Sequence, residues 1–408
     1  MPDVLKPRHA KDVEAAIQWA LGAGKALEVV GHATKRSLGR PAQSDVTLDV
    51  SGLAGVTLYE PEELVLSAHA GTALADIEHL VATHNQELAF EPLDLGFLLG
   101  QPAGAGTIGG ALATNLAGSR RLKAGAARDH FLGVAAVSGR GESFKSGGRV
   151  VKNVTGYDLC KLLAGSWGTL AVMTEVTVKV VPRAETEMTL LVVGLDDAAA
   201  IRAMTAAMGS ACDVSGAAHL PPAAAARTAP ELALGRAVTA LRLEGVEPSV
   251  AHRGRALEAL MRPLGDLLAL NQWQSRAVWR AIRNAVAFAA HGPAAARAVW
   301  RISTAPTMGA EVGRRIAAKA DVELLYDWAG GLVWAATAPS EDADETSVRE
   351  AVAGSGGHAT LVRAPAAIRA VVPVFEPAQG ALAALTARVK ESFDPKGVLN
   401  PGRMWAGV

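Results

Sequence analysis

Apolar and polar positions follow two periods in the first part of the chain, and these periods predict its helices and strands. Residues 1–22 have the spacing of an amphipathic helix, and residues 26–30 form a short apolar run typical of a buried strand. Residues 45–71 alternate as several short strands, a helix begins at Thr72, and another alternating strand spans 172–181. Interleaved helices and strands of this kind predict an α+β domain.

Beyond Pro182 strand and helix patterns recur, which predicts a separate, smaller α/β layer packed over the first domain. The alanine-rich residues 221–230 are predicted to be a loop, and residues 271–301 are predicted to be helical. A strand pair is expected within 320–337. Residues 393–404 contain too many turn formers for a helix and are predicted to be a tail that packs against another part of the chain.

The length of 408 residues exceeds what one hydrophobic core normally supports, so more than one domain is expected. We predict a first domain at 1–182, a second at 183–370, and a C-terminal segment at 371–408 that returns to the first domain. No G-x-G-x-x-G sequence lies between the first strand and its helix, and no acidic residue is placed to bind a ribose hydroxyl, so the first domain does not match a Rossmann fold.

Glycines cluster around Thr107, at positions 104, 106, 109 and 110, and Thr107 is a plausible cap for a short helix that follows. Because glycine has no Cβ, backbone can come very close to a ligand at these positions. Several N–H groups at the start of a helix suit a bound pyrophosphate or a flavin oxygen. The predicted strand at 26–30 also ends in a glycine and small polar residues, a common arrangement for holding a diphosphate, although an ordinary turn has the same composition.

Composition and charge exclude several classes of protein. The net charge of zero disfavours a polyanionic partner such as a nucleic acid. The two cysteines, Cys160 and Cys212, are too few for a disulfide framework or an iron–sulfur centre. The N-terminal residues are charged where a signal peptide is apolar, and no stretch reaches the roughly 20 apolar residues of a membrane span. A cytoplasmic location is expected, with membrane association only through partners.

The motifs together resemble the vanillyl-alcohol oxidase, or PCMH-type FAD-binding, superfamily, and within it the FAD-binding subunits of bacterial glycolate oxidases. The superfamily resemblance covers residues 1–182 and the tail. It rests on short motifs: the Gly31 to Lys35 loop, Gln101-Pro102, Thr107-Ile108-Gly109-Gly110, Asn115, Gly118, Lys152-Asn153, Gly156-Tyr157-Asp158-Leu159, Gly165-Ser166, Gly168-Thr169-Leu170 and Asn400-Pro401-Gly402. The resemblance to these subunits rests on Trp279 to Arg283, Trp300-Arg301-Ile302-Ser303, Asp327-Trp328-Ala329-Gly330, Trp334 and Gly357 to Leu361.

The resemblance implies an extended FAD between two α+β subdomains, under a cap domain, with the C-terminal segment near the flavin. The cofactor-binding residues that it implies are Gly31, His32, Ala33, Thr34, Lys35, Pro102, Gly104, Gly106, Thr107, Ile108, Gly109, Gly110, Thr114, Asn115, Gly118, Gly156, Tyr157, Asp158, Gly168, Leu170, Val172 and Asn400. Relatives often link flavin covalently through a histidine, but Thr34 stands at that position here. We therefore expect non-covalent FAD.

Oxidation of a 2-hydroxy acid needs a cation for the carboxylate, a base for the hydroxyl proton and the flavin as hydride acceptor. Catalytic relatives carry a histidine-rich H-x-G-D-G-N-x-H cluster that this sequence lacks, and His219, His252, His291 and His358 are isolated. No metal site is expected and no catalytic residue is assigned. Arg276, Arg280 and Arg283 share a helical face and could bind a carboxylate or form a solvated surface. The tryptophans of the second half suit either a core or an interface.

The missing cluster favours one component of an oxidoreductase complex over an autonomous enzyme. The resemblance implies a glycolate oxidase complex that oxidises glycolate, with D-lactate as a second candidate substrate. Its expected partners are the second FAD-linked subunit of glycolate oxidase and the iron–sulfur subunit of the same complex. Two alternatives remain open: a free-standing FAD-dependent dehydrogenase or oxidase of the same superfamily, and a non-catalytic scaffold with a degenerate FAD site.

Overall fold

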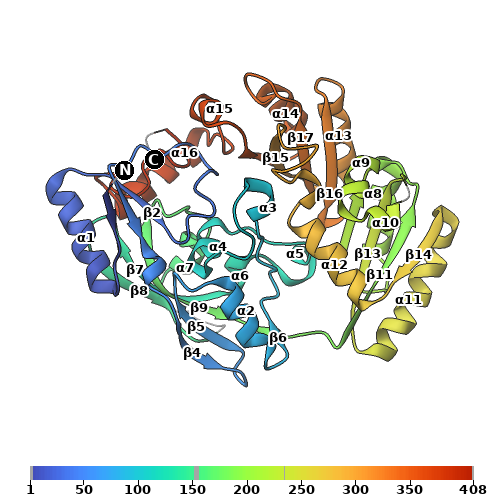
Figure 1. The fold of residues 1–408 in the computed structure, drawn as a ribbon, viewed down its shortest axis with the longest axis horizontal. Coiled ribbons are helices and arrows are strands. Elements are labelled where there is room, and N and C mark those ends of the chain that lie inside the picture. Colours follow the sequence, from blue (N-terminus) through green and yellow to red (C-terminus); the bar gives the residue numbers. More distant parts are fainter. Residues whose placement is uncertain (1–2, 151–155, 234, 407–408) are drawn as a thin grey trace.

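The computed structural model describes residues 3–150, 156–233 and 235–406. Figure 1 shows two halves side by side, with the N-terminal elements in blue and cyan in one half and the green to orange elements in the other. The red C-terminal helix α16 (Gly380–Phe393) lies beside the blue N-terminal elements, so the end of the chain returns to its beginning.

The first half contains a small parallel sheet in the order β1-β3-β2, which a helix covers. The helix buries Val13, Ile17 and Ala20, the spacing expected for an amphipathic helix, and Gly24 ends it in the left-handed conformation with φ 60°. The strand pattern did not predict β1. The bounds are β1 (Asp3–Leu5), α1 (Ala10–Ala23), β2 (Leu27–Val30) and β3 (Val46–Asp49).

A five-stranded antiparallel sheet in the order β4-β5-β9-β7-β8 forms the rest of the first half. Short helices surround it because glycine-rich turns interrupt the chain between strands. The bounds are β4 (Val56–Glu60), β5 (Val65–His69), α2 (Leu74–Ala82), β6 (Gln86–Glu87), α3 (Gly96–Leu99), α4 (Ile108–Thr114), α5 (Arg121–Ala124), α6 (Ala127–His130), β7 (Phe131–Ser138), β8 (Ser143–Gly147), α7 (Leu159–Leu163), β9 (Ala171–Lys179) and β10 (Val181–Pro182). The predicted strands and the α+β class of this half are confirmed.

The second half is built on an eight-stranded sheet in the order β14-β11-β13-β12-β16-β17-β15-β18. Its recorded strand pairs are all antiparallel, so helices cover an antiparallel sheet and the connections are not parallel βαβ units. Its strands are β11 (Thr186–Val193), β12 (Gly216–Leu220), β13 (Val238–Gly245), β14 (Asp266–Leu270), β15 (Ala298–Ser303), β16 (Val322–Asp327), β17 (Leu332–Thr337) and β18 (His358–Arg363). Its helices are α8 (Asp197–Met208), α9 (Pro222–Thr228), α10 (Pro230–Ala233), α11 (Glu247–Met261), α12 (Gln272–Arg283), α13 (Gly309–Ala317), α14 (Glu345–Val352) and α15 (Ala366–Val371).

Two predictions for the second half are wrong. The alanine-rich segment predicted as a loop forms α9 and α10, because proline at the first helical position is compatible with a helix and alanine favours one. The helix predicted across 271–301 ends at Arg283. Ala285 then adopts the left-handed conformation with φ 49°, and β15 begins at Ala298.

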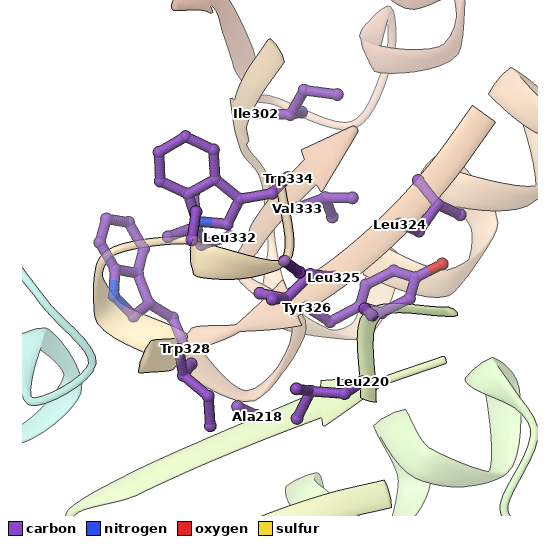
Figure 2. Close-up of a cluster of buried hydrophobic side chains, with 14 of the residues drawn as sticks. Ala218, Leu220, Ile302, Leu324, Leu325, Tyr326, Trp328, Leu332, Val333 and Trp334 are labelled. Carbon is purple, nitrogen blue, oxygen red and sulfur yellow. The ribbon is translucent and has the colours of Figure 1, made fainter. Parts of the chain in front are cut away.

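Large aromatic side chains fill the core of the eight-stranded half. Trp300, Trp334 and Tyr326 are almost completely buried. Trp328 is buried as well, and in Figure 2 it lies with Trp334 at one end of the cluster while Tyr326 lies at the other end. Trp273 is the exception among the second-half tryptophans singled out in the sequence, with 81% of its side chain exposed. Most of these residues therefore belong to the core and not to an interface.

A buried ionic network joins the two halves. Arg242 on β13 is 2% exposed and its guanidinium lies 2.9 Å from the carboxylate of Glu91 in the first half. Arg120 bonds to Glu87 in its own half and to Glu244 on β13, the latter at 2.5 Å. Burial opposes the charge of Glu91, but Arg242 and Arg120 lower the pKa of that carboxyl to about 2. Charges of both signs thus neutralise one another along this contact.

The division at Pro182 follows the sheets, since β10 pairs with β6 of the first half and β11 belongs to the eight-stranded sheet. Whether the halves are independent domains stays a prediction. Among the helices of the described residues, none has the length and apolarity needed to cross a bilayer.

Candidate functional site

A groove in the first half lies between the end of β2, α4, the start of β9 and the C-terminal tail. It holds about 790 Å³ of space, part of it open to solvent. Twelve of the predicted cofactor-binding residues line it: Gly31, His32, Ala33, Thr34, Lys35, Thr107, Gly109, Gly110, Thr114, Gly168, Val172 and Asn400.

The two glycine-containing loops meet in this groove. A Cβ added to Gly31 would lie 2.7 Å from Oγ1 of Thr107, so only glycine allows this approach. His32 is exposed and lines the groove, and its Nδ1 lies 3.0 Å from the carbonyl oxygen of Ala105. The two loops that the sequence suggested for a ligand therefore line one groove. The imidazole of His32 also contacts the facing loop, a role that we did not predict.

The N–H groups at the start of α4 do not have the role that the sequence suggested. Thr107 caps the helix as predicted, and its Oγ1 accepts a hydrogen bond from the Gly110 N–H at 3.2 Å. The N–H of Ile108 donates to Thr72 and that of Gly109 donates to Ala70. A Cβ on Gly109 would lie 2.7 Å from the Ala70 carbonyl oxygen. These glycines therefore allow close packing of the protein on itself, and their amides are not available to a ligand.

The loop after β2 is different. Among the described residues, no acceptor is recorded for the backbone N–H groups of residues 32–35. Ala33 adopts the left-handed conformation with φ 56°, which is uncommon for a residue with a side chain. Successive amides around such a residue form the concave arrangement that binds anions in many proteins. This loop, and not the start of α4, is the part of the groove suited to a phosphate.

Lys35 adds a positive charge to the same loop. Burial lowers the pKa of its ammonium to about 8, an effect that the carboxylate of Asp94 partly offsets. Within the described part of the chain its Nζ has no recorded hydrogen bond or ion pair. The nearest glycine positions, Gly106 and Gly110, place their added Cβ atoms 3.9 and 4.0 Å from this Nζ. A half-buried and largely desolvated ammonium without an ion-pair partner is unfavourable unless a ligand supplies the negative charge.

The C-terminal tail closes one side of the groove. Asn400 accepts a hydrogen bond from the Val29 N–H at 2.8 Å and donates to the Trp167 carbonyl at 2.9 Å. Arg403 donates to the Lys35 carbonyl at 2.7 Å, and burial lowers the pKa of its guanidinium to about 10. The tail thus fixes the position of the Lys35 loop.

The remaining ten predicted residues do not line the groove. Pro102 and Gly104 are exposed, Gly106 lies beside Lys35, and Ile108 and Leu170 are buried in the core beneath the groove. Asn115 ends α4, and Gly118 lies at the contact between the halves.

Gly156 and Tyr157 are exposed and Asp158 caps α7. The motif residues Lys152-Asn153 lie outside the described residues.

Some lining residues were missed in the sequence. They are Val29, Val30, Arg36, Val50, Ala70, Ala113, Trp167, Ala171, Met173 and Arg403. Trp167 and Arg403 are close to predicted residues in the sequence and could have been found from that position. Ala70 could not, because only the packing of the β5–α2 turn against Gly109 brings it to the groove.

The other candidates from the sequence separate in space. Arg276 pairs with Glu187 at 3.4 Å, whereas Arg280 is exposed, so the arginine row does not converge on one ligand. His219 is buried and bonds to Thr239 at 2.9 Å and to Asp197 at 3.3 Å, as a structural histidine would. Among residues 3–150, 156–233 and 235–406, no group of histidine, cysteine and acidic residues is placed to hold a metal ion.

Comparisons with known proteins agree with this geometry. Residues 2–147 match the family model of the FAD binding domain, so the cofactor is FAD. The solved structure of p-cresol methylhydroxylase aligns with a TM-score of 0.73 at 12% identity, covering 99% of this chain and 88% of that one. The PCMH-type fold that the motifs suggested is therefore confirmed.

Two relatives extend over nearly the whole chain. The glycolate oxidase subunit GlcD of Bacillus subtilis is 24% identical over 437 residues, which cover 100% of this chain and 89% of the relative. The glycolate oxidase subunit GlcE of Escherichia coli is 31% identical over 390 residues, which cover 93% of both chains. With this identity over both halves and the tail, the chain belongs to the family of the glycolate oxidase subunit GlcE.

Proposed function

We propose that this chain, an FAD-dependent oxidoreductase of 2-hydroxy acids, oxidises glycolate as one subunit of a larger complex. The observation that carries the proposal is the groove at residues 31–35, where backbone amides without a recorded acceptor in the described chain and the buried Lys35 ammonium suit an anion. The similarity to GlcE over both halves supports the substrate class.

The residues of the groove fit a non-covalent FAD. We assign the pyrophosphate to the amides of residues 32–35 and to Lys35, because this loop combines positive charge with donors that have no recorded acceptor among the described residues. The apolar wall formed by Val172, Met173 and Trp167 suits the flat ring systems of the cofactor. Thr34 has no chemistry for a covalent link to the flavin.

Bound FAD supplies the redox step by accepting the hydride from the carbinol carbon. The protein has to bind the 2-hydroxy acid, orient it and remove the hydroxyl proton. The described residues contain no metal-binding cluster for this purpose. A complex with a second FAD-linked subunit and an iron–sulfur subunit would provide both a complementary active site and an exit for the electrons. Membrane association would then come from those partners.

Absorbance of the purified chain tests the cofactor assignment. Flavin bands near roughly 370 and 450 nm would reject a scaffold with a degenerate site, because the chromophore belongs to the cofactor. Their absence after incubation with FAD would overturn the proposal.

Anaerobic addition of glycolate then distinguishes the remaining alternatives. We expect little bleaching of the flavin by this chain alone and rapid bleaching when the partner subunits are co-expressed. Complete bleaching of the isolated chain would favour a free-standing dehydrogenase, and D-lactate should be tested in parallel.

A further inference from the structure

Motifs far apart in the second half converge with a segment of the first half at the buried ring of Trp328. The guanidinium carbon of Arg301 on β15 lies 4.9 Å from the centroid of this ring, and that of Arg121 on α5 lies 4.8 Å from it. Arg301 also lies 5.9 Å from the Trp334 ring, which is beside Trp328 in Figure 2. Two guanidinium groups from different halves of the molecule therefore share one aromatic platform.

Neither arginine has a carboxylate partner among the described residues. No ion pair or side-chain hydrogen bond is recorded for Arg121 or Arg301, and the Nε of Arg301 is buried without an acceptor. Burial, and then the charge of Arg121, lower the pKa of the Arg301 guanidinium to about 10, and the carboxylate of Asp327 partly offsets this effect. Arg121 and Arg301 therefore repel one another, and a bound anion would offset this repulsion.

Asp327, the residue before Trp328 in the sequence, already has hydrogen-bond donors of its own. Its carboxylate accepts hydrogen bonds from the Ser119 hydroxyl at 2.6 Å and from the Trp328 N–H at 2.7 Å. Trp328 and Ala329 both have left-handed backbone conformations, with φ of 53° and 55°. Such strain persists only where surrounding contacts enforce it, and it is common at binding sites.

The platform is connected to the first half near the FAD groove through Trp328. The Trp328 indole N–H donates to the Gly118 carbonyl at 2.9 Å, and Gly118 follows the groove residue Thr114 by four positions. Bound substrate at the platform would therefore lie beside the cofactor groove, in the contact between the two halves.

We propose that Arg121 and Arg301, supported by Trp328, bind the carboxylate of the 2-hydroxy acid substrate. Guanidinium groups recognise carboxylates through paired, charge-assisted hydrogen bonds. Because Arg121 belongs to the first half and Arg301 to the second, a bound carboxylate would also hold the two halves together. This assignment rests on the proposed function, since it names the binding site for the substrate of that reaction.

His358 stands near the same site. Its side chain reaches solvent, while partial desolvation and then the charge of Arg301 lower the pKa of the imidazole. A neutral imidazole adds no third cation and can accept a hydrogen bond from the substrate hydroxyl. Arg283 also has a buried Nε without an acceptor in the described chain, but the carboxylates of Glu78 and Glu91 act on the same region, so it is a poorer anion site.

Calorimetric titration of the FAD-loaded chain with oxalate, a dicarboxylate that cannot be oxidised at a carbinol, tests the proposal. We expect saturable oxalate binding and no binding of the neutral analogue oxamide. R121Q and R301Q should each weaken oxalate binding by about 10- to 100-fold without loss of bound FAD, the range for one charge-assisted contact. R301K should retain part of the affinity.

R280Q is the matched control, because Arg280 is exposed on α12 and should not affect oxalate binding. Equal oxalate affinity in wild type, R121Q and R301Q would overturn the assignment, as would absence of binding to the wild type. If R301Q fails to fold, R121Q decides the outcome, because Arg121 is exposed. Loss of FAD together with oxalate in R121Q would instead make Arg121 structural. A wild type that retains no FAD refutes the proposed function and is visible before any titration.

Discussion

Arg120 and Arg121 are neighbours in the chain but have opposite surroundings. Arg120 lies among three carboxylates, those of Glu87, Glu91 and Glu244, and is mostly buried with them. Arg121 shares the Trp328 ring with a second arginine, and no carboxylate pairs with either in the described part of the chain. The cluster in which each cation has carboxylate partners holds the two halves in place. The cations without recorded carboxylate partners are available to a ligand.

A second pair of cations, Lys35 and Lys390, shows the same contrast. Lys390 is a buried lysine that donates to the Thr169 carbonyl and to Asp394, both at 2.7 Å, and it fixes the C-terminal tail. Lys35 has no such partners recorded among the described residues. In both pairs, the presence or absence of recorded partners distinguishes a cation with a structural role from one with a binding role.

The largest effect on stability should come from breaking the buried cluster of arginines and carboxylates between the halves. R242M removes the cation that pairs with Glu91 and leaves that carboxylate buried, so we expect the free energy of unfolding to fall by about 3–5 kcal/mol. Urea unfolding measures this loss. R314M, which removes an exposed cation beside Glu311, should leave stability unchanged. If R242M unfolded at the wild-type urea concentration, the network would have no structural role.

A pH-dependent effect is expected at Asp327, which lies between the two clusters. Burial raises the pKa of this carboxyl to about 6 in the folded chain, above the ordinary value of 3.8. The folded state therefore binds an extra proton between these values, and stability falls as pH rises from about 4 to 6, by at most about 3 kcal/mol.

D327N removes this titration. Relative to wild type, the variant should gain stability as pH rises from 4 to 7, which thermal unfolding across that range would measure. The exposed D213N variant should follow the wild-type profile. Parallel curves for D327N and wild type would show that Asp327 keeps an ordinary pKa.

Local patterns predicted much of the fold and half of the groove. The period of two identified β3 to β5, and the cap at Thr107 was correct, because these features depend only on neighbours in the sequence. The glycine cluster around Thr107 also correctly indicated that the loop before α4 lines the groove opposite residues 31–35. Its amides were assigned wrongly, because a glycine in the sequence does not reveal whether a ligand or the protein's own backbone occupies the space beside it.

The cations without carboxylate partners could not be predicted from the sequence. Arg121 and Arg301 meet through contacts between segments 180 positions apart, and Arg120 looks the same as Arg121 in the sequence. Only the folded chain shows which of the two faces carboxylates. The motif around Arg301 and Trp328 was recognised as a family signature, but no local pattern explained it physically.

K35M should affect cofactor binding more than stability. Removing the ammonium eliminates one charge-assisted contact to the pyrophosphate, so FAD affinity should fall about 10- to 100-fold. The apoprotein should be no less stable than wild type, because a desolvated charge has been removed. Fluorescence titration of apoprotein with FAD measures the affinity, and K25M, an exposed lysine variant, serves as the control. Loss of stability without loss of affinity would make Lys35 structural, like Lys390.

The smallest effect is the pH dependence of FAD affinity, and it tests the same lysine without a structural change. The pKa of Lys35 is about 8 in the protein without ligand, and a bound pyrophosphate would raise it, because the ligand favours the charged form. Below pH 8 the ammonium is already protonated and affinity should be constant. Above pH 8 binding must take up a proton, so affinity should fall by up to about tenfold per pH unit. K35M should show no such decline between pH 7 and 9.5, and a decline that persisted in K35M would have to come from another group.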